Sequence, residues 1–111
     1  MEDIKKLEFV FQTLADSNRL RILRHIGKNT CSVSEIVAAT GLSQPLVSHH
    51  LKILRERAIL ETKRKGPFIL YALKDERILD ALGIFTEITA NITNTHFDRR
   101  AFHCPKWFRK Q

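Results

Sequence analysis

The chain has 111 residues, a length that allows one domain. It carries 19 Lys and Arg against 12 Asp and Glu, and the formal net charge of +7 favours nucleic acid, an acidic protein or an anionic membrane as partner. We expect a cytoplasmic protein with no membrane span, because no run of about 18 apolar residues occurs, the N-terminus lacks signal-peptide features, and Cys31 and Cys104 are too few for a disulfide scaffold.

The first third of the chain has the spacing and the end signals of three helices. Apolar residues at helical intervals predict a first helix over about residues 3 to 14. A second helix is predicted to start with Ser17 as its N-cap and to stop near Gly27. Ser32 and Glu35 match a capping box with Ser32 as the N-cap, which predicts a third helix that runs from there to Thr40.

The next segment is typical of the turn and recognition helix of a helix-turn-helix. Gly41 can adopt the positive φ of a tight turn, Ser43 is a good N-cap, and Pro45 lies in the first helical turn. One face of this helix is predicted to be apolar and to bear Val47, Leu51, Leu54 and Ala58. Another face carries groups that pair with base edges and phosphates, namely Gln44, Ser48, Lys52 and Arg55. A solvated polar face is the alternative, and the basic charge of the chain argues against it.

The pattern then changes to that of a β-hairpin. Residues 59–65 and 68–73 are short, rich in β-branched and aromatic side chains, and separated by Gly66 and Pro67. A hairpin directly after a recognition helix is the wing of a winged helix. Its tip cations lie close enough to touch phosphates or an adjacent minor groove, and they are Lys63, Arg64 and Lys65.

A fifth helix is predicted from about residue 75 to about residue 95. The first and fifth helices hold more large apolar residues than one small domain needs, including Phe9, Phe11, Ile84 and Phe85. A two-fold dimer that buries both helices would solve this and would present two recognition helices to a palindromic site. The predicted fold is therefore mainly α with a small β-hairpin, a winged helix-turn-helix over residues 1–95. Residues 96–111 are predicted to form a basic, aromatic C-terminal extension.

Three segments resemble the arsenic-repressor (ArsR/SmtB) family of winged-helix regulators: residues 14–23, residues 42–54 and the wing end at residues 71–73. The resemblance covers about residues 4 to 95. It implies a homodimeric repressor with five helices and a two-stranded wing, released from double-stranded operator DNA by an inducer. By position, it implies that Gln44, Ser48 and His49 read bases, that Ser43 and Lys52 hold phosphates, and that the wing cations anchor the flank.

The two metal sites best known in that family are not predicted here. The positions of a Cys-x-Cys motif hold Ser32 and Ser34, and the fifth helix lacks an Asp-x-His with a matching His pair. The remaining candidates for binding a thiophilic metal, a metalloid or a zinc-like ion are Cys31, His96, His103 and Cys104. Three alternatives stay open: a thiol sensor of metalloid or redox state, a histidine-containing metal site, and structural cysteines in a metal-independent regulator.

Two other classes of function are alternatives to a DNA-binding repressor, namely a protein-contact module and an enzyme. A winged helix used for protein contact would lack salt-sensitive affinity for DNA. An enzyme is not expected, because the chain has no Cys-x-x-Cys, no Gly-rich phosphate loop and no recognisable set of nucleophile, base and orienting group.

Overall fold

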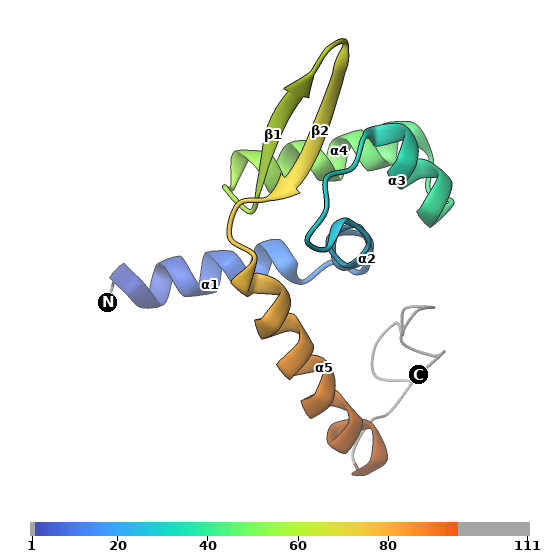
Figure 1. Cartoon of the computed structure of the whole chain (residues 1–111). Helices are drawn as coiled ribbons and strands as arrows, with labels where there is room; N and C mark the ends of the chain where they lie inside the picture. Colours follow the sequence, from blue (N-terminus) through green and yellow to red (C-terminus); the bar gives the residue numbers. More distant parts are fainter. Residues whose placement is uncertain (1, 96–111) are drawn as a thin grey trace. The chain divides into compact units, whose positions relative to one another are not determined.

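The computed structural model describes residues 2–95, and its elements follow the predicted order (Figure 1). This part of the chain contains five helices and one antiparallel hairpin, which confirms the predicted winged helix-turn-helix. The elements are α1 (Glu2–Leu14), α2 (Ser17–Ile26), α3 (Val33–Thr40), α4 (Gln44–Glu56), β1 (Leu60–Lys65), β2 (Phe68–Leu73) and α5 (Arg77–Thr95). They fall into two compact units, one ending at Asp75 and one beginning at Glu76.

The core of the first unit lies where α2, α3 and α4 meet the base of the hairpin (Figure 1). Each of these elements turns its apolar side inward, as helical and strand periodicity dictates. Burying one such aliphatic side chain contributes about 1.5–3 kcal/mol. The apolar side chains that are at most 2% exposed are Ile22, Leu23, Ile26, Ile36, Val47, Leu51, Leu54 and Leu60.

Local hydrogen bonds define where the helices begin. Ser32 and Glu35 form the predicted capping box, with both reciprocal bonds at 3.2 Å. Ser43 is the N-cap of α4, as predicted, and its Oγ accepts from the N–H of Leu46. The prediction for α2 was wrong by one residue. Asp16, rather than Ser17, has the extended backbone of an N-cap, and its carboxylate accepts from the N–H of Arg19 at 3.0 Å.

The end of α4 also corrects the sequence prediction. Ala58 was expected to continue the apolar stripe, but α4 ends at Glu56, and Ala58 is exposed with a left-handed φ of 62°. Its N–H bonds to the carbonyl of Arg55, and that of Ile59 bonds to the carbonyl of Leu54. These two bonds form a Schellman motif, in which a left-handed residue closes the helix. The reversal brings Ile59, which is 9% exposed, to the core in place of Ala58.

The hairpin has the predicted strands, and β1 begins one residue later than expected. Six residue pairs run from Leu60–Leu73 at the base to Lys65–Phe68 at the tip, where Gly66 takes a φ of 62°. The segment before α3 fixes the hairpin near its middle, because Cys31 and Tyr71 exchange two backbone hydrogen bonds of 3.0 and 2.8 Å. The base of the hairpin therefore lies in the core, β2 is held by its pairing with Cys31, and the tip extends into solvent.

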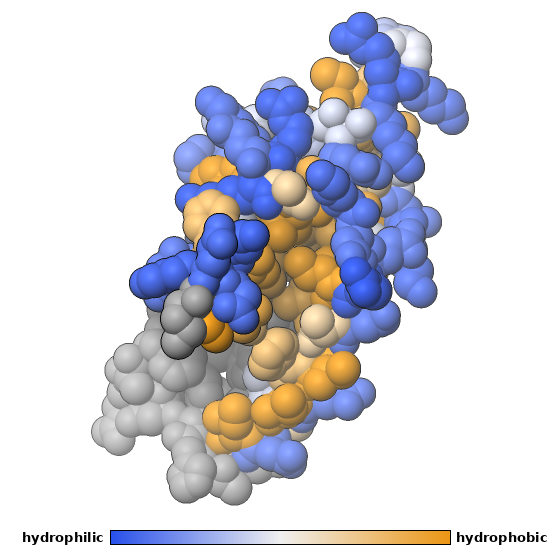
Figure 2. All heavy atoms as spheres, turned by 90° about the vertical axis from the view of Figure 1, so that its left-hand side faces the viewer, coloured by the Kyte–Doolittle hydropathy of each residue, from blue (hydrophilic) through white to orange (hydrophobic). Residues whose placement is uncertain are grey.

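Large apolar side chains also lie open at the surface, and Figure 2 shows such residues in orange. On α1 they are Ile4, Leu7, Phe9 and Phe11, and on α5 they are Ile84, Phe85, Ile88 and Ile92, all at least 45% exposed. Among the described residues, no helix is both long and apolar enough to span a membrane.

Candidate nucleic-acid interface

Helix α4 has a buried apolar stripe and a separate set of exposed polar side chains. Its apolar stripe is closed off from solvent, since Val47, Leu51 and Leu54 are 0% exposed. Every side chain predicted to contact DNA from this helix is exposed: Gln44, Ser48, His49, Lys52 and Arg55. Burial of one face fixes the rotation of the helix about its axis, so the exposed side presents an amide, a hydroxyl, an imidazole and two cations to solvent.

Ser43 precedes this face at the N-terminus of α4. Its hydroxyl oxygen is the helix cap, which uses the group as an acceptor. The hydroxyl hydrogen can still be donated, because Ser has one donor as well as two acceptor lone pairs. A phosphate at this end would also meet the positive end of the helix dipole. The structure is thus compatible with the predicted phosphate contact of Ser43, which stays a prediction.

The turn between α3 and α4 is held by side chains from neighbouring elements. Gly41 adopts the left-handed conformation predicted for it, with φ of 74°. Arg21 of α2 donates from Nη2 to the carbonyl of Thr40 at 2.8 Å, which satisfies one of the last carbonyls of α3. Leu42 then donates its N–H to the hydroxyl of Thr40 at 3.3 Å. These bonds set the angle at which α4 leaves the turn.

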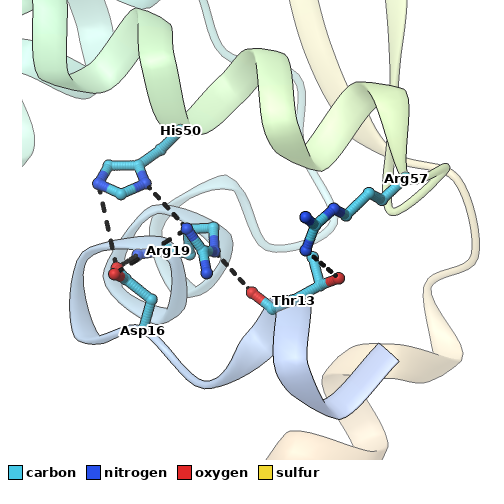
Figure 3. Close-up of polar contacts among 5 residues, drawn as sticks. All are labelled: Thr13, Asp16, Arg19, His50 and Arg57. Atoms are coloured by element: carbon cyan, nitrogen blue, oxygen red, sulfur yellow. Dashed lines mark hydrogen bonds and ion pairs between the residues drawn. The ribbon is translucent and has the colours of Figure 1, made fainter. Parts of the chain in front are cut away.

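A partly buried polar cluster links α4 to α2 (Figure 3). His50 is only 5% exposed, and its ring lies between Arg19 and Asp16 at the start of α2. Nδ1 of His50 is 3.4 Å from Nη1 of Arg19, and Nε2 is 4.0 Å from Oδ1 of Asp16. Arg19 also donates from Nε to the carbonyl of Thr13 at 2.6 Å, at the end of α1.

Burial lowers the pKa of His50, and the positive charge of Arg19 and the neighbouring His49 lower it further, while Asp16 opposes the shift. The imidazole is therefore neutral at pH 7. Because a guanidinium can only donate, Nδ1 must be the acceptor, and the ring proton lies on Nε2 facing the carboxylate. His50 is not among the residues predicted from the sequence to have a role. The signal was available, because position 50 falls between Val47 and Leu54 on the buried side of the helix.

A second contact holds the C-terminal end of α4 on α1 (Figure 3). Arg57 donates from Nη1 to Oγ1 of Thr13 at 3.1 Å, and its guanidinium carbon lies 4.8 Å from the centroid of the Phe9 ring. Thr13, which is fully buried, donates in turn to the carbonyl of Phe9 at 2.8 Å. The middle and the C-terminal end of α4 are thereby tied to polar partners, and the helix is held in position as well as in rotation.

The wing cations Lys63, Arg64 and Lys65 are exposed, as a phosphate contact requires. Successive residues of a strand point to opposite faces. Lys63 and Lys65 therefore share one face of the ribbon, and Arg64 lies on the other.

Among the predicted sensing residues, the structure describes Cys31. Its side chain is 5% exposed, and burial together with the charge of Glu35 raises the pKa of its thiol. A thiol kept protonated is a poor nucleophile and a poor metal ligand. His96, His103 and Cys104 lie outside the described residues. Within residues 2–95, no three His, Cys, Asp or Glu side chains are grouped so as to hold a metal ion.

Comparison with known proteins decides the family. Residues 16–62, from the N-cap of α2 into β1, match the family described as bacterial regulatory protein, arsR family. The transcriptional repressor SdpR of Bacillus subtilis is 32% identical over 73 residues, which are 66% of this chain and 81% of that protein. The chain belongs to the ArsR family. This confirms the resemblance drawn from residues 14–23, 42–54 and 71–73.

Other similar proteins agree with this assignment. The arsenic resistance transcriptional regulator ArsR1 of Pseudomonas putida is 40% identical over 77 residues, which are 68% of this chain and 60% of that protein. The crystal structure of NolR from Sinorhizobium fredii matches with a TM-score of 0.70 and 29% identity, over 78% of this chain and 87% of that one. As an ArsR-family member, the chain is a DNA-binding transcription regulator and not an enzyme.

The buried imidazole predicts how stability depends on pH. His50 binds a proton less readily in the folded chain than in the unfolded chain, whose histidine pKa is near 6.5. The contribution of neutral His50 to the stability of the fold is therefore complete above pH 6.5. It is lost as the pH falls from 6.5 towards the folded-state pKa, because the unfolded chain then binds the proton more readily. We expect the free energy of unfolding, measured by urea denaturation, to decrease over this interval.

The matched control pair is His50→Gln and His49→Gln, because His49 is adjacent and exposed. His50→Gln should flatten the pH dependence, whereas His49→Gln should leave it as in the parent. Equal slopes in the parent and in His50→Gln would show that the cluster does not hold the imidazole neutral.

Proposed function

We propose that this ArsR-family chain is a homodimeric repressor that binds a palindromic operator through α4 and the wing and is released by an inducer. The observation that carries the proposal is the two-sided character of α4. The stripe that fixes the helix is fully buried, and the side chains with base-reading chemistry are exposed to solvent. In this arrangement Gln44, Ser48 and His49 read base edges in the major groove.

Phosphate contacts from α4 and from the wing would hold the recognition helix in register with the base pairs. Ser43 and Lys52 supply them from α4, with Arg55 one helical turn further along the same face. The exposed wing cations reach the flank, where Lys63, Arg64 and Lys65 neutralise backbone charge. Such contacts give salt-dependent affinity for any duplex, and the α4 side chains add preference for one sequence.

The exposed apolar faces of α1 and α5 support a dimer. On α1, Ile4, Leu7 and Phe11 recur at helical spacing and line an open groove of about 510 Å³. On α5, Ile84, Ile88 and Ile92 do the same at intervals of four residues. Contact between two copies through these faces would remove apolar area from water and place two α4 helices about a two-fold axis. A palindromic operator follows from that symmetry.

The inducer follows less directly from the residues. The buried, protonated Cys31 favours a structural role, in which it packs beneath the wing and pairs with Tyr71 through the backbone. The name of the similar ArsR1 concerns arsenic resistance. Release by a thiophilic metalloid, a metal ion or oxidation through Cys31 and Cys104 is therefore the hypothesis to test against a metal-independent regulator.

The base-reading role of α4 predicts a loss of specificity. We expect Gln44→Ala to bind DNA from upstream of its own gene more weakly by about 1–3 kcal/mol, with random duplex affected far less. Fluorescence anisotropy on both duplexes measures this difference. Equal losses on the two duplexes would contradict base reading by Gln44.

The wing predicts the opposite signature. Arg64→Ala should weaken both duplexes alike and reduce the slope of log K against log salt by about 0.9, the share of one phosphate contact. Glu61→Ala, on the same strand, is the control that removes an acidic charge instead. An unchanged slope for Arg64→Ala would exclude this contact.

The dimer proposal predicts that a charge on α5 separates the subunits. Ile84→Glu should sediment as a monomer at concentrations where the parent is a dimer, because a carboxylate would be buried without a partner. Ile69→Glu is the matched control, since this residue is 47% exposed but lies on the wing. Two variants of equal mass in analytical ultracentrifugation would contradict an α5 interface.

The inducer test uses the preformed complex with upstream DNA. Arsenite, zinc and a disulfide-forming oxidant are added to the parent and to a Cys31→Ser, Cys104→Ser variant, and release is followed by anisotropy. Thiol sensing predicts release from the parent only. From the buried state of Cys31 we expect Cys31→Ser alone to bind DNA as the parent does, and release that is lost in this single variant would contradict its structural role.

A further inference from the structure

The wing tip carries an aromatic side chain that the fold does not use. Phe68 is 62% exposed, the highest value among the large apolar residues that the structure describes. Burial along β2 increases away from it, from exposed Phe68 to buried Ala72 and Leu73. The turn beside it is set by Gly66 at φ 62° and by Pro67. Neither the core nor the turn accounts for a phenyl ring at this position.

The register of the hairpin places this ring among cations. Phe68 pairs with Lys65, and Leu70 pairs with Lys63, and cross-strand partners lie on the same face of a ribbon. The face with the ring therefore bears two lysines. Arg64 lies on the other face of the ribbon, where it pairs with Ile69. No ion pair engages these three cations within residues 2–95.

These features indicate the chemistry of the occupant. Residues 62–70 contain three cations and no acidic residue, so the surface that meets the tip must be anionic at its edges. An exposed ring between the cations fits an apolar surface behind that charge. The minor groove of duplex DNA offers both, with phosphates along its rims and sugars and base edges at its floor.

We propose that Phe68 is an apolar wedge, inserted by the wing into the minor groove that flanks the α4 contact, where it partly unstacks one base step. This inference rests on the proposed DNA-binding function and adds a recognition element to it. Side chains of this kind kink the duplex where they enter, and pyrimidine–purine steps yield most easily. The wedge would make affinity depend on a flanking step that α4 does not touch.

The test separates the ring from the charge of the wing. Phe68→Lys removes the ring and adds a cation, and Thr62→Lys adds a cation lower on β1, where Thr62 is also exposed. On DNA from upstream of its own gene, Phe68→Lys should bind about 10- to 100-fold more weakly than the parent, the equivalent of losing one buried phenyl side chain. Thr62→Lys should bind as tightly as the parent or more tightly, and Phe68→Leu should retain part of the affinity.

A spectroscopic readout locates the wedge. Footprinting first defines the flank as the DNA that the parent protects from cleavage and Arg64→Ala does not. 2-Aminopurine then replaces each adenine of this flank in turn. Binding of the parent should raise the fluorescence at one step, because unstacking relieves quenching, and Phe68→Lys should give no rise at saturating protein. Unchanged melting temperatures show that all variants are folded, as expected for exposed positions.

Each other result overturns the proposal in a distinguishable way. If Phe68→Lys binds as Thr62→Lys does and keeps the 2-aminopurine signal, the wedge is wrong and the repressor function stands. If the parent shows no salt-sensitive binding to this DNA, both the wedge and the proposed function fall. If Phe68→Lys binds DNA normally but loses binding to phosphatidylserine vesicles that the parent binds, the tip is a lipid-contacting surface instead.

Discussion

One-sided burial of α4 is the constraint on which the rest of the structure depends. Val47, Leu51 and Leu54 are closed off from solvent by α2, α3 and the base of the wing. This apolar contact fixes the rotation of the helix, so Gln44 and Ser48 must point away from the core. The wing follows directly, because the left-handed Ala58 reverses the chain and delivers Ile59 and β1 to the same core.

The polar cluster around His50 adds direction to that apolar contact. Hydrophobic packing resists separation of two helices but is non-directional, so it allows small shifts of one helix along the other. Hydrogen bonds weaken when the distance or angle changes, so they restrict such shifts. Asp16 caps α2 and faces His50 of α4, and Arg19 joins the same ring to the end of α1. A neutral imidazole suits this place, since a protonated ring would put a second buried cation against Arg19.

The surface chemistry divides recognition of DNA into parts with different physical origins. Hydrogen-bonding groups on α4 distinguish base edges, wing cations respond to charge and salt, and the ring of Phe68 would respond to how easily a base step opens. Cys31 lies at the junction of core and wing and pairs with Tyr71. Because the Cys31 side chain is buried, its place in the fold fits a role in positioning the wing rather than a role at the solvent-exposed surface.

Local patterns along the chain were enough to predict the elements and the family. Periods of 3.6 and 2 residues, the capping box at Ser32 and the turn residues Gly41 and Gly66 are local signals, because each depends on the backbone preferences of a few neighbouring residues. The exposure of the predicted contacts on α4 followed from the same periodicity.

Contacts between elements distinguish neighbouring residues that are locally equivalent. Asp16 and Ser17 can both cap a helix, and the carboxylate at position 16 is the one that also faces His50. His49 and His50 are the same residue type one position apart, yet one is exposed and the other is buried between charges from α2. Ala58 continues the helical pattern, but the packing of Ile59 against the core ends the helix before it. Such outcomes depend on partners distant in sequence, which a local pattern does not contain.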